Sequence, residues 1–293
     1  MNLLITGAWT DAKKHIAEIE AMGHQVRFLQ QEKDELPCTY EWVEGVICNG
    51  LFLHHPISQL TNLRYIQLTS AGYDRVPMDE VERRHIEIHN ARGVYSIPMA
   101  EFAIAGVLDL YKDMARFREK QKRHVWTKNR SIRELAGSKV LIIGCGSVGT
   151  ECAKRFKAFG CWVIGIDINV RDDRHYDAIK ELQELQAEAK DADVMVLTLP
   201  LTGETRGLID REILGFFKGI LVNIARGGVV DQKALEEWNG SAVLDVFEEE
   251  PLKECSPLWE REGTIVTPHN SFVGNGNGMR LTQVIFNNLK GES

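Results

Sequence analysis

The feature that most constrains the fold is a glycine-rich turn between an apolar run and an amphipathic segment. The run Lys139 to Ile143 leads into Gly144-Cys-Gly-Ser-Val-Gly149, and a helical pattern follows it. In such a turn the first glycine permits the bend, the second lets the backbone approach a pyrophosphate, and the third lets the helix pack closely. A helix N-terminus also attracts anions, so the segment predicts a dinucleotide site at Gly144, Gly146, Ser147, Val148 and Gly149. The alternative is a glycine turn without a ligand.

A carboxylate at the end of the next strand strengthens this prediction. The run Trp162 to Ile166 ends in Asp167, 18 residues after Gly149 (167 − 149). At that position a carboxylate binds both ribose hydroxyls of NAD and repels the 2′-phosphate of NADP. NAD is therefore favoured as the cofactor over NADP, although Arg171, four residues later, weakens the preference.

Short β-branched runs alternate with helical patterns along the whole chain, which is typical of parallel sheets wrapped by helices. A first set of strands is expected at 3–6, 26–29, 46–48, 65–69 and 86–89. A second set of six is expected at 140–143, 162–166, 194–199, 220–224, 242–246 and 264–267. Helices are expected at Asp11 to Met22, around Ala234, Leu235 and Trp238, and where Tyr176, Ile179, Leu182 and Leu185 recur every third residue. The pattern predicts α/β architecture with doubly wound parallel sheets.

The length of 293 residues exceeds what one hydrophobic core usually serves, so two domains, or one large α/β domain, are expected. A helix from Ser96 to Leu110 is apolar almost all round and should be buried. The charged segment Lys112 to Arg133 follows it. Its composition fits a bridge between the domains, and it fits the end of a surface helix equally well.

The composition limits the class of partner. The formal net charge is −7, with 44% apolar and 26% charged residues, as in ordinary globular proteins. No long Lys/Arg run supplies the positive field that nucleic acids or anionic membranes require, so we expect a small-molecule partner. No run is long and apolar enough for a membrane span, and the N-terminus does not resemble a signal peptide, so we expect a cytoplasmic protein.

The six cysteines contain no C-x-x-C pair, so we expect reduced thiols without a metal or a disulfide.

Three polar residues follow successive strands of the second set. Arg226 follows 220–224, Glu250 follows 242–246 and His269 follows 264–267. Ligands of open parallel sheets bind at the carboxyl ends of the strands, so these residues should share one edge with the glycine turn. A guanidinium can hold a carboxylate, an imidazole can transfer a proton, and a glutamate can orient that imidazole. Together they suit reduction of a 2-keto acid by hydride, while each alone also reads as a surface or loop residue.

Several strings of the sequence resemble the D-isomer-specific 2-hydroxyacid dehydrogenases, a group that includes glyoxylate/hydroxypyruvate reductases and phosphoglycerate dehydrogenases. They are Gly144-Cys-Gly-Ser-Val-Gly149, Leu199-Pro-Leu-Thr-Gly-Glu-Thr-Arg206, Val222-Asn-Ile-Ala-Arg-Gly-Gly228, Leu244-Asp-Val-Phe-Glu-Glu-Glu-Pro-Leu252 and Thr267-Pro-His269. The resemblance implies that Arg226 binds the substrate, that His269 donates and accepts the proton, and that Glu250 pairs with His269. It places Asp245 near the nicotinamide carboxamide. Further cofactor contacts are expected at Pro200, Thr205, Ile224 and Ala225.

The same resemblance implies a Rossmann dinucleotide-binding domain, residues 95–271, inserted in a flavodoxin-like substrate-binding domain, residues 1–94 and 272–293. Within Ser70-Ala-Gly-Tyr-Asp74, the backbone of Ala71 and Gly72 is expected to bind the substrate carboxylate together with Arg226 and His269. The C-terminal helix, Leu281 to Leu289, would return to the first domain, and the active site would lie in the cleft between the domains. A homodimer through the cofactor domain is also implied.

We therefore expect an NAD-dependent oxidoreductase that reduces a small 2-keto acid to the D-2-hydroxy acid, with glyoxylate and hydroxypyruvate as the first candidates. A phosphoglycerate-type dehydrogenase is an alternative, because Arg75 and Arg92 can bind a second anion. A non-catalytic NAD(H) sensor on the same scaffold is another, since fold alone does not fix function. His54, His55 and Trp259 are candidates for a small polar pocket. Two departures from the family pattern are the short segment 234–245 and the glycine-rich loop 270–278.

Overall fold

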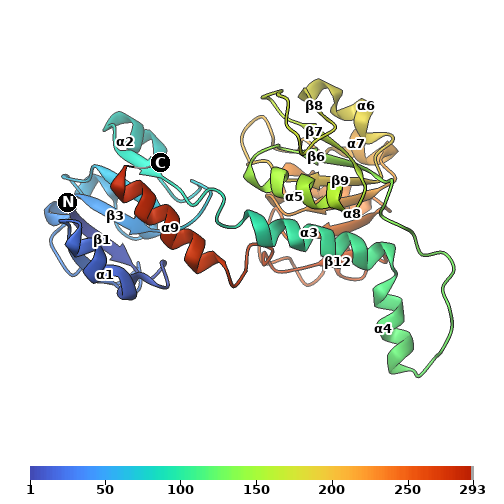
Figure 1. Ribbon diagram of the computed structural model, residues 1–293, viewed down its shortest axis with the longest axis horizontal. Helices are drawn as coiled ribbons and strands as arrows, with labels where there is room; N and C mark the ends of the chain where they lie inside the picture. The colour runs from blue at the N-terminus through green and yellow to red at the C-terminus, as the bar shows by residue number, and fades with distance from the viewer. Residues whose placement is uncertain (292–293) are drawn as a thin grey trace. The chain divides into compact units, whose positions relative to one another are not determined.

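The computed structural model describes residues 1–291, and it divides the chain into two compact units (Figure 1). One unit consists of Met1–Tyr95 together with the chain from Gly274 onward, and the other is Ser96–Val273. Each junction lies within two residues of the boundary expected from the sequence. The second unit is thus an insertion between two parts of the first.

The first unit is built on a five-stranded sheet in the order β2-β1-β3-β4-β5, in which all neighbouring strands are parallel. This is the flavodoxin-like order. The strands are β1 (Asn2–Thr6), β2 (Gln25–Leu29), β3 (Gly45–Cys48), β4 (Tyr65–Leu68) and β5 (Glu87–His89). The helices are α1 (Ala12–Ala21), α2 (Met78–Arg83) and α9 (Asn277–Lys290).

Alternate side chains of a strand point to opposite faces of its sheet. Both faces of this sheet are covered, each by its own hydrophobic core. Leu3 and Ile5 of β1 pack with Leu281 and Ile285 of α9, whereas Leu4 belongs to a separate core on the other face. The resemblance had placed the C-terminal helix in this unit. Figure 1 shows it running beside α1.

The second unit is built on a seven-stranded sheet in the order β12-β11-β10-β9-β6-β7-β8, again entirely parallel. The strand order reverses between β6 and β9, as in a Rossmann fold. The strands are β6 (Lys139–Ile143), β7 (Trp162–Ile166), β8 (Ala178–Lys180), β9 (Val194–Leu197), β10 (Ile220–Asn223), β11 (Ser241–Leu244) and β12 (Thr264–Val266). The helices are α3 (Ser96–Tyr111), α4 (Met114–Lys122), α5 (Ser147–Ala158), α6 (Leu185–Ala189), α7 (Arg211–Phe216) and α8 (Gln232–Glu237).

Strand β8 corrects the expectation of a helix over Tyr176 to Leu185. The segment forms a three-residue edge strand, a short 3-10 turn and then α6. Ile179 packs into the core, while the N–H of Asp167 donates to Lys180 O at 3.0 Å. A three-residue edge strand offers a single inward side chain, so apolar spacing cannot distinguish it from a helical turn.

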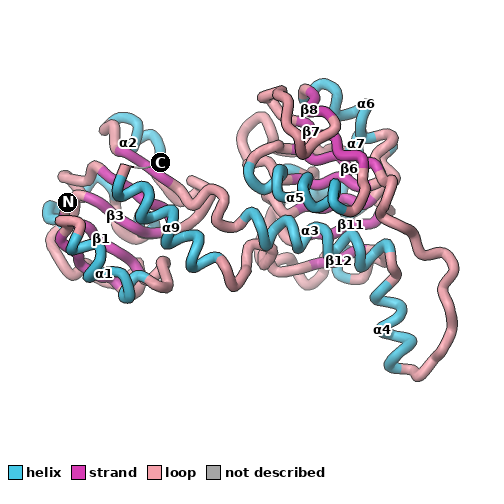
Figure 2. Tube along the Cα trace, viewed as in Figure 1, coloured by secondary structure: helices cyan, strands magenta, loops and turns pink. Residues whose placement is uncertain are grey.

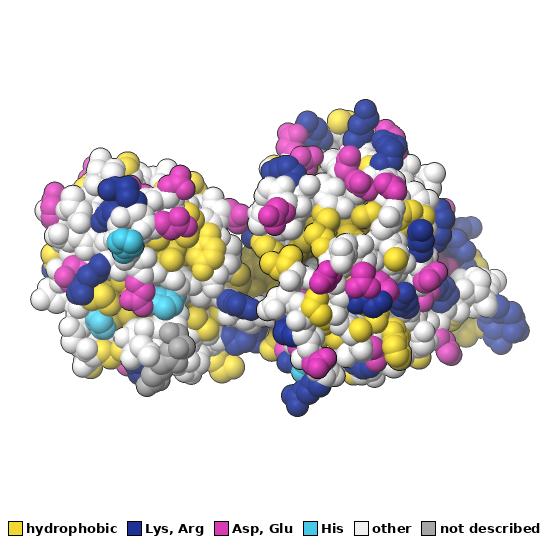
Figure 3. Space-filling model, turned by 90° about the horizontal axis from the view of Figure 1, so that it is seen from above, with side chains coloured by type: hydrophobic (Ala, Val, Ile, Leu, Met, Phe, Trp, Pro, Cys, Tyr) yellow, Lys and Arg dark blue, Asp and Glu magenta, His cyan; other side chains and the backbone are white. Residues whose placement is uncertain are grey.

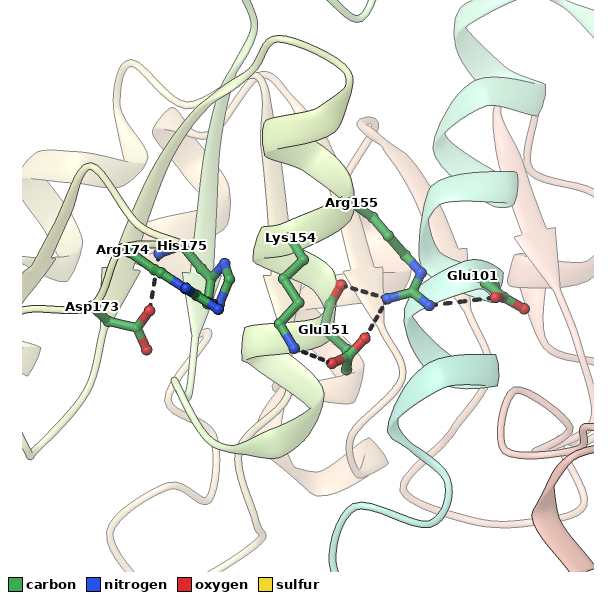
Figure 4. Close-up of polar contacts among 7 residues, drawn as sticks. All are labelled: Glu101, Glu151, Lys154, Arg155, Asp173, Arg174 and His175. Atoms are coloured by element: carbon green, nitrogen blue, oxygen red, sulfur yellow. Dashed lines mark hydrogen bonds and ion pairs between the residues drawn. The ribbon is translucent and has the colours of Figure 1, made fainter. Parts of the chain in front are cut away.

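Helix α3 packs against α5, and Gly106 permits its close approach to the sheet. A Cβ at Gly106 would lie 2.7 Å from Val243 Cγ1. The helix is largely buried, as expected, but Glu101 and Ala105 are exposed, so one side of it faces solvent. An ion pair links the two helices, because Arg155 of α5 binds Glu101 of α3 at 3.4 Å (Figure 4).

The charged segment Lys112 to Arg133 is not a bridge between the units. It lies wholly within the second unit, where it forms α4 and the start of a long returning loop (Figures 1 and 2). Asp113, with φ of 53°, separates α3 from α4. The second of the two sequence interpretations, a solvated helix end, therefore describes this segment.

Charged side chains of both signs lie on the surface, as one view of it shows. On the face drawn in Figure 3, Lys and Arg are interspersed with Asp and Glu. Among the helices of residues 1–291, none combines the length and apolar composition of a bilayer span. Across the same residues, no group of three or more His, Cys, Asp or Glu is arranged to hold a metal ion.

Candidate active site

The glycine turn has the geometry that a bound pyrophosphate requires. Gly144 has φ of 92°, which disfavours any residue with a side chain, and its N–H donates to Ile166 O at 2.8 Å. A Cβ at Gly149 would lie 2.1 Å from Gly144 O, so the helix start and the strand end touch. At Gly146 a Cβ would meet no described atom within 4 Å. The second glycine therefore faces open space beside the N-terminus of α5, and the residues present fit a dinucleotide.

Asp167 lies against this turn. One of its carboxylate oxygens accepts from the Cys145 N–H at 2.6 Å and the other from the Asn169 N–H at 2.9 Å. Arg171 donates from Nη2 to the carbonyl oxygen of Cys145 at 2.5 Å. A carboxylate and a guanidinium therefore both bind the residue between the first two glycines.

The loop after β9 runs beside the glycine turn. Thr198 Oγ1 donates to Gly144 O at 2.6 Å, and Leu199 lies in contact range of Gly144. Within the loop, Thr205 Oγ1 donates to Pro200 O at 2.7 Å. Pro200 and Thr205 thus belong to one compact loop next to the expected nucleotide site.

The turn after β10 carries Ile224, Ala225 and Arg226, and the side chain of Asn223 shapes it. Asn223 Oδ1 accepts from the Ala225 N–H, and its Nδ2 donates to Arg226 O, both at 3.1 Å. Arg226 is half-buried, and its Nη1 donates to Ala225 O at 2.8 Å. The sequence reasoning did not select Asn223. Its position at a strand end beside Arg226 is the signal that would have found it.

His269 and Glu250 form a direct pair. His269 Nδ1 lies 2.9 Å from Glu250 Oε2, and Glu250 Oε1 accepts from the Phe247 N–H at 3.0 Å. The two side chains are 42% and 37% exposed, so the pair is open to solvent. The backbone of His269 has φ of 50°, in the left-handed region. Such a conformation in a non-glycine residue persists where the surroundings fix it.

Asp245 supplies that support. It is fully buried, and its carboxylate accepts from Thr267 Oγ1 at 2.7 Å and from the N–H groups of Asn270 and Ser271, both at 2.8 Å. Its own carbonyl oxygen accepts from the His269 N–H at 2.8 Å. Asp245 therefore holds the segment that carries His269. The sequence reasoning did not select Thr267 for this role, although it lies in the Thr267-Pro-His269 string.

Ala71 and Gly72 lie in the first unit, in a turn just after β4. Ser70 Oγ donates to Gly72 O at 3.0 Å, and Asn90 Nδ2 donates to Ala71 O at 2.7 Å. These bonds fix the carbonyl groups. Within residues 1–291 the N–H groups of Ala71 and Gly72 make no hydrogen bond, which is the condition for binding an anion.

His55, one of the residues suggested for a polar pocket, lies in the interior of the first unit. His55 is 6% exposed, and its ring nitrogens pair with Tyr40 OH and Asp34 O, each at 3.1 Å. It is a hydrogen-bonded core residue, so its assignment to a pocket is wrong. Arg75 binds Asn49 Oδ1 at 3.1 Å, and Arg92 is exposed.

The fold and this geometry define a two-unit α/β protein with a Rossmann unit fitted to a dinucleotide. A family profile described as D-isomer specific 2-hydroxyacid dehydrogenase, NAD binding domain, matches residues 104–271. The chain belongs to the D-isomer specific 2-hydroxyacid dehydrogenase family, and it is an oxidoreductase of that class.

Relatives agree with this assignment over most of the chain. A glyoxylate reductase from Korarchaeum cryptofilum is 31% identical over 239 residues, which are 78% of this chain and 72% of that protein. A D-3-phosphoglycerate dehydrogenase from Methanocaldococcus jannaschii is 35% identical over 225 residues, 73% of this chain but only 42% of that protein. The crystal structure of a D-isomer specific 2-hydroxyacid dehydrogenase family protein from Aeromonas salmonicida has a TM-score of 0.84 and 27% identity. The match covers 99% of this chain and 95% of the Aeromonas protein.

Proposed function

We propose that the protein is an NAD(H)-dependent enzyme that reduces a small 2-keto acid to the D-2-hydroxy acid, with glyoxylate or hydroxypyruvate as substrate. The observation that carries this proposal is the 2.9 Å contact between His269 Nδ1 and Glu250 Oε2. These residues and the glycine turn follow strands of the same sheet. Arg226 follows β10, next to the strand that precedes Glu250. An acid–base pair, a cation and a nucleotide turn are the groups that hydride reduction of a keto acid needs.

The pair with Glu250 supports proton transfer from the other ring nitrogen of His269. An ionised carboxylate only accepts hydrogen bonds, so Nδ1 must donate to Glu250. This leaves Nε2 of the protonated ring to donate to the carbonyl oxygen of the substrate. Bound NADH supplies the hydride that reaches C2 of the substrate. The proton from Nε2 neutralises the charge that then develops on oxygen, and His269 ends the step as neutral imidazole.

Arg226 has two roles in this proposal. Its guanidinium matches a carboxylate bidentately and so orients the keto acid. It also stabilises the negative charge that develops on the carbonyl oxygen. The N–H groups of Ala71 and Gly72 bind the substrate carboxylate as well. Ser70 and Asn90 bond to the carbonyl oxygens of these two residues and not to their N–H groups.

The remaining assignments concern the cofactor. The first turn of α5, with Gly146, Ser147 and Val148, binds the pyrophosphate, and Asp167 binds the ribose hydroxyls. The remaining contact residues, which would hold the nicotinamide half, are Pro200, Thr205, Ile224, Ala225 and Asp245. NAD is the proposed cofactor on the strength of Asp167.

A phosphoglycerate-type substrate is the second candidate. It is supported by the 35% identity to a D-3-phosphoglycerate dehydrogenase and by the position of Arg75 close to Asn49, near the carboxyl ends of the first sheet. A guanidinium there suits a phosphate. Arg92 is a further cation in this unit.

The proposal is tested by following NADH oxidation at a fixed enzyme concentration with glyoxylate, hydroxypyruvate, pyruvate, 2-ketobutyrate and phosphohydroxypyruvate. Preference for glyoxylate or hydroxypyruvate supports the first candidate. Preference for phosphohydroxypyruvate that is lost in Arg75→Ala supports the second. Tight NADH binding without turnover of any acid overturns both and favours a nucleotide-sensing protein.

We also propose a homodimer. The segment that follows α3 carries exposed apolar side chains, namely Met114, Val125, Trp126 and Ile132, and Trp126 is 98% exposed. Several exposed apolar side chains on one segment favour an interface, whereas a single one would be ordinary.

The six free thiols support a cytoplasmic location, where thiols stay reduced.

A further inference from the structure

A carboxylate of the first unit lies where the segments after neighbouring strands of its sheet meet. We propose that Glu32 is a positioning residue, which fixes Asn49 so that Asn49 presents the guanidinium of Arg75 to the carboxylate of the substrate. The inference rests on the proposed function, because it concerns the part of that site that the first unit supplies. It gives Glu32 and Asn49 a role in substrate binding that acts through another residue.

Glu32 links the ends of three strands. It follows β2, and its Oε1 accepts from Thr6 Oγ1, at the end of β1, at 2.8 Å. Oε1 also accepts from the Asn49 N–H and Oε2 from the Gly50 N–H, both at 2.7 Å and both in the segment after β3. In this sheet the strand order reverses between β1 and β3, which is where ligands of such sheets bind. The carboxylate of Glu32 takes that position, so we place the substrate over the neighbouring strands, β3 and β4.

Asn49 connects the end of β3 with the segment after β4. Its Oδ1 accepts from Arg75 Nη1 at 3.1 Å. The backbone joins the same two strand ends, because the Thr69 N–H donates to Cys48 O at 2.8 Å. Arg75 lies three residues after Gly72, in the segment whose turn is proposed to bind the substrate carboxylate. The guanidinium is therefore held at the edge of the sheet to which that carboxylate is assigned.

The charge of Arg75 remains available to an anion. A Cβ at Gly50 would lie 3.4 Å from Glu32 Oε2 and 3.5 Å from Arg75 Cδ, so both side chains border one position. Within residues 1–291 they form no ion pair, since the oxygens of Glu32 accept from N–H and hydroxyl groups and Arg75 donates to a neutral amide. A bond between two charged groups is roughly twice as strong as a neutral one, so a carboxylate competes well with that amide. Arg75 is exposed, so a substrate can reach it.

The bonds of Glu32 require a carboxylate. Three donors point at its two oxygens, whereas a glutamine side chain has one oxygen and an NH₂ group that only donates. In Glu32→Gln the N–H of Asn49 or that of the buried Gly50 loses its acceptor, which is costly for a buried donor. The segment after β3 then shifts, and Asn49 no longer holds Arg75 in one place.

The test is calorimetric titration of the NADH-loaded protein with oxamate, an unreactive analogue of a 2-keto acid. We expect Glu32→Gln, Asn49→Ala and Arg75→Ala each to weaken oxamate binding by about three- to tenfold. The double variant Glu32→Gln/Arg75→Ala should bind oxamate no more weakly than Arg75→Ala, because the residues act in one chain of contacts. NADH affinity should stay within about twofold of wild type in every variant, since the proposed nucleotide site lies in the second unit.

Two further variants separate this role from a general effect on the fold. Glu35→Gln removes the same charge from the same loop, and the exposed Glu35 side chain makes no hydrogen bond or ion pair within residues 1–291, so its oxamate affinity should stay within about twofold of wild type. Asn49→Ala keeps the N–H that Glu32 accepts and removes only the acceptor of Arg75. It therefore tests the connection even if Glu32→Gln does not fold.

Two results would overturn the inference. One is an Asn49→Ala or Glu32→Gln protein that binds oxamate as wild type does. The other is a double variant whose loss equals the product of the two single losses, which would make Glu32 a structural residue of the first unit. These titrations need no turnover, so the proposed function fails separately. Coupled losses in a protein that reduces no keto acid would remove the proposed function alone, whereas uncoupled losses in an active enzyme would remove this inference alone.

Discussion

Replacing Asp245 with asparagine keeps the size of a buried side chain but removes one of its acceptor oxygens. The Asp245 carboxylate is fully buried and accepts three hydrogen bonds, from Thr267 Oγ1 and from the N–H groups of Asn270 and Ser271. An amide has a single oxygen and an NH₂ group that only donates. If the amide oxygen of the asparagine points toward Thr267 and Asn270, its NH₂ group faces the N–H of Ser271. Ser271 is only 2% exposed, so water does not replace the lost acceptor.

The magnitude follows from these three bonds. A buried donor left without an acceptor costs about 1–3 kcal/mol, and a bond to a charged group is stronger than a neutral one by about 1 kcal/mol. The sum for Asp245→Asn is about 3 kcal/mol. For a unit of about 180 residues this lowers the melting temperature by about 6–12 °C. Since the Asp245 carbonyl and carboxylate both hold the segment around His269, turnover should fall as well.

The assay is thermal unfolding by circular dichroism, combined with kcat for the preferred keto acid. Asp231→Asn is the matched control. Asp231 caps α8 by accepting from the Ala234 N–H at 2.9 Å, and asparagine caps a helix about as well as aspartate. We expect Asp231→Asn to melt close to wild type. An Asp245→Asn protein with wild-type melting and wild-type kcat would refute the assigned role of Asp245.

Three further predictions concern other parts of the second unit. Gly149→Ala should weaken NADH binding more than about tenfold in a titration, because its Cβ would lie 2.1 Å from a carbonyl oxygen, whereas Gly215→Ala meets no described atom within 4 Å and should bind normally. Iodoacetamide at pH 8 should modify exposed Cys255 first, and Cys145, whose pKa burial raises to about 12, only on unfolding; early labelling of Cys145 by mass spectrometry would contradict this. Trp126→Ala should shift the protein toward monomer in light scattering, and an unchanged mass would count against the proposed interface.

The parts of the fold that the sequence predicts well are those fixed by local chemistry. Gly144 has a positive φ and Gly149 packs against Gly144 O, so both positions require glycine, and the turn forms where the spacing indicates. The buried strands of both sheets read as apolar runs because both of their faces are covered. The strand set needed only one correction, the addition of β8.

The errors share a physical cause. Strand β8 has three residues, and helix α3 is apolar yet partly exposed, so local patterns carry little information about either. Lys112 to Arg133 is charged because it is solvated, and composition alone does not say which units a solvated segment connects. Contacts decide these questions, and contacts are non-local.

The same limit applies to the site. Strand order brings Arg226, Glu250 and His269 to the carboxyl ends of neighbouring strands, which the sequence could predict. The bonds that Asp245 makes to residues 22 to 26 positions away, and the bond from Arg171 to Cys145 across 26 positions, have no local signature. The sequence singles out both residues, but these bonds appear only once the segments are assembled.

The central claim is that His269 transfers the proton, and one pair of measurements tests it most directly. These are kcat for NADH-dependent reduction of the preferred 2-keto acid and the dissociation constant of NADH, for wild type and for His269→Asn. Asparagine suits the substitution because it tolerates the left-handed backbone at this position, where φ is 50°. The account predicts a kcat lower by about 10²- to 10⁴-fold with NADH affinity within about twofold of wild type. Undiminished turnover, or equal losses in turnover and in NADH binding, would contradict it.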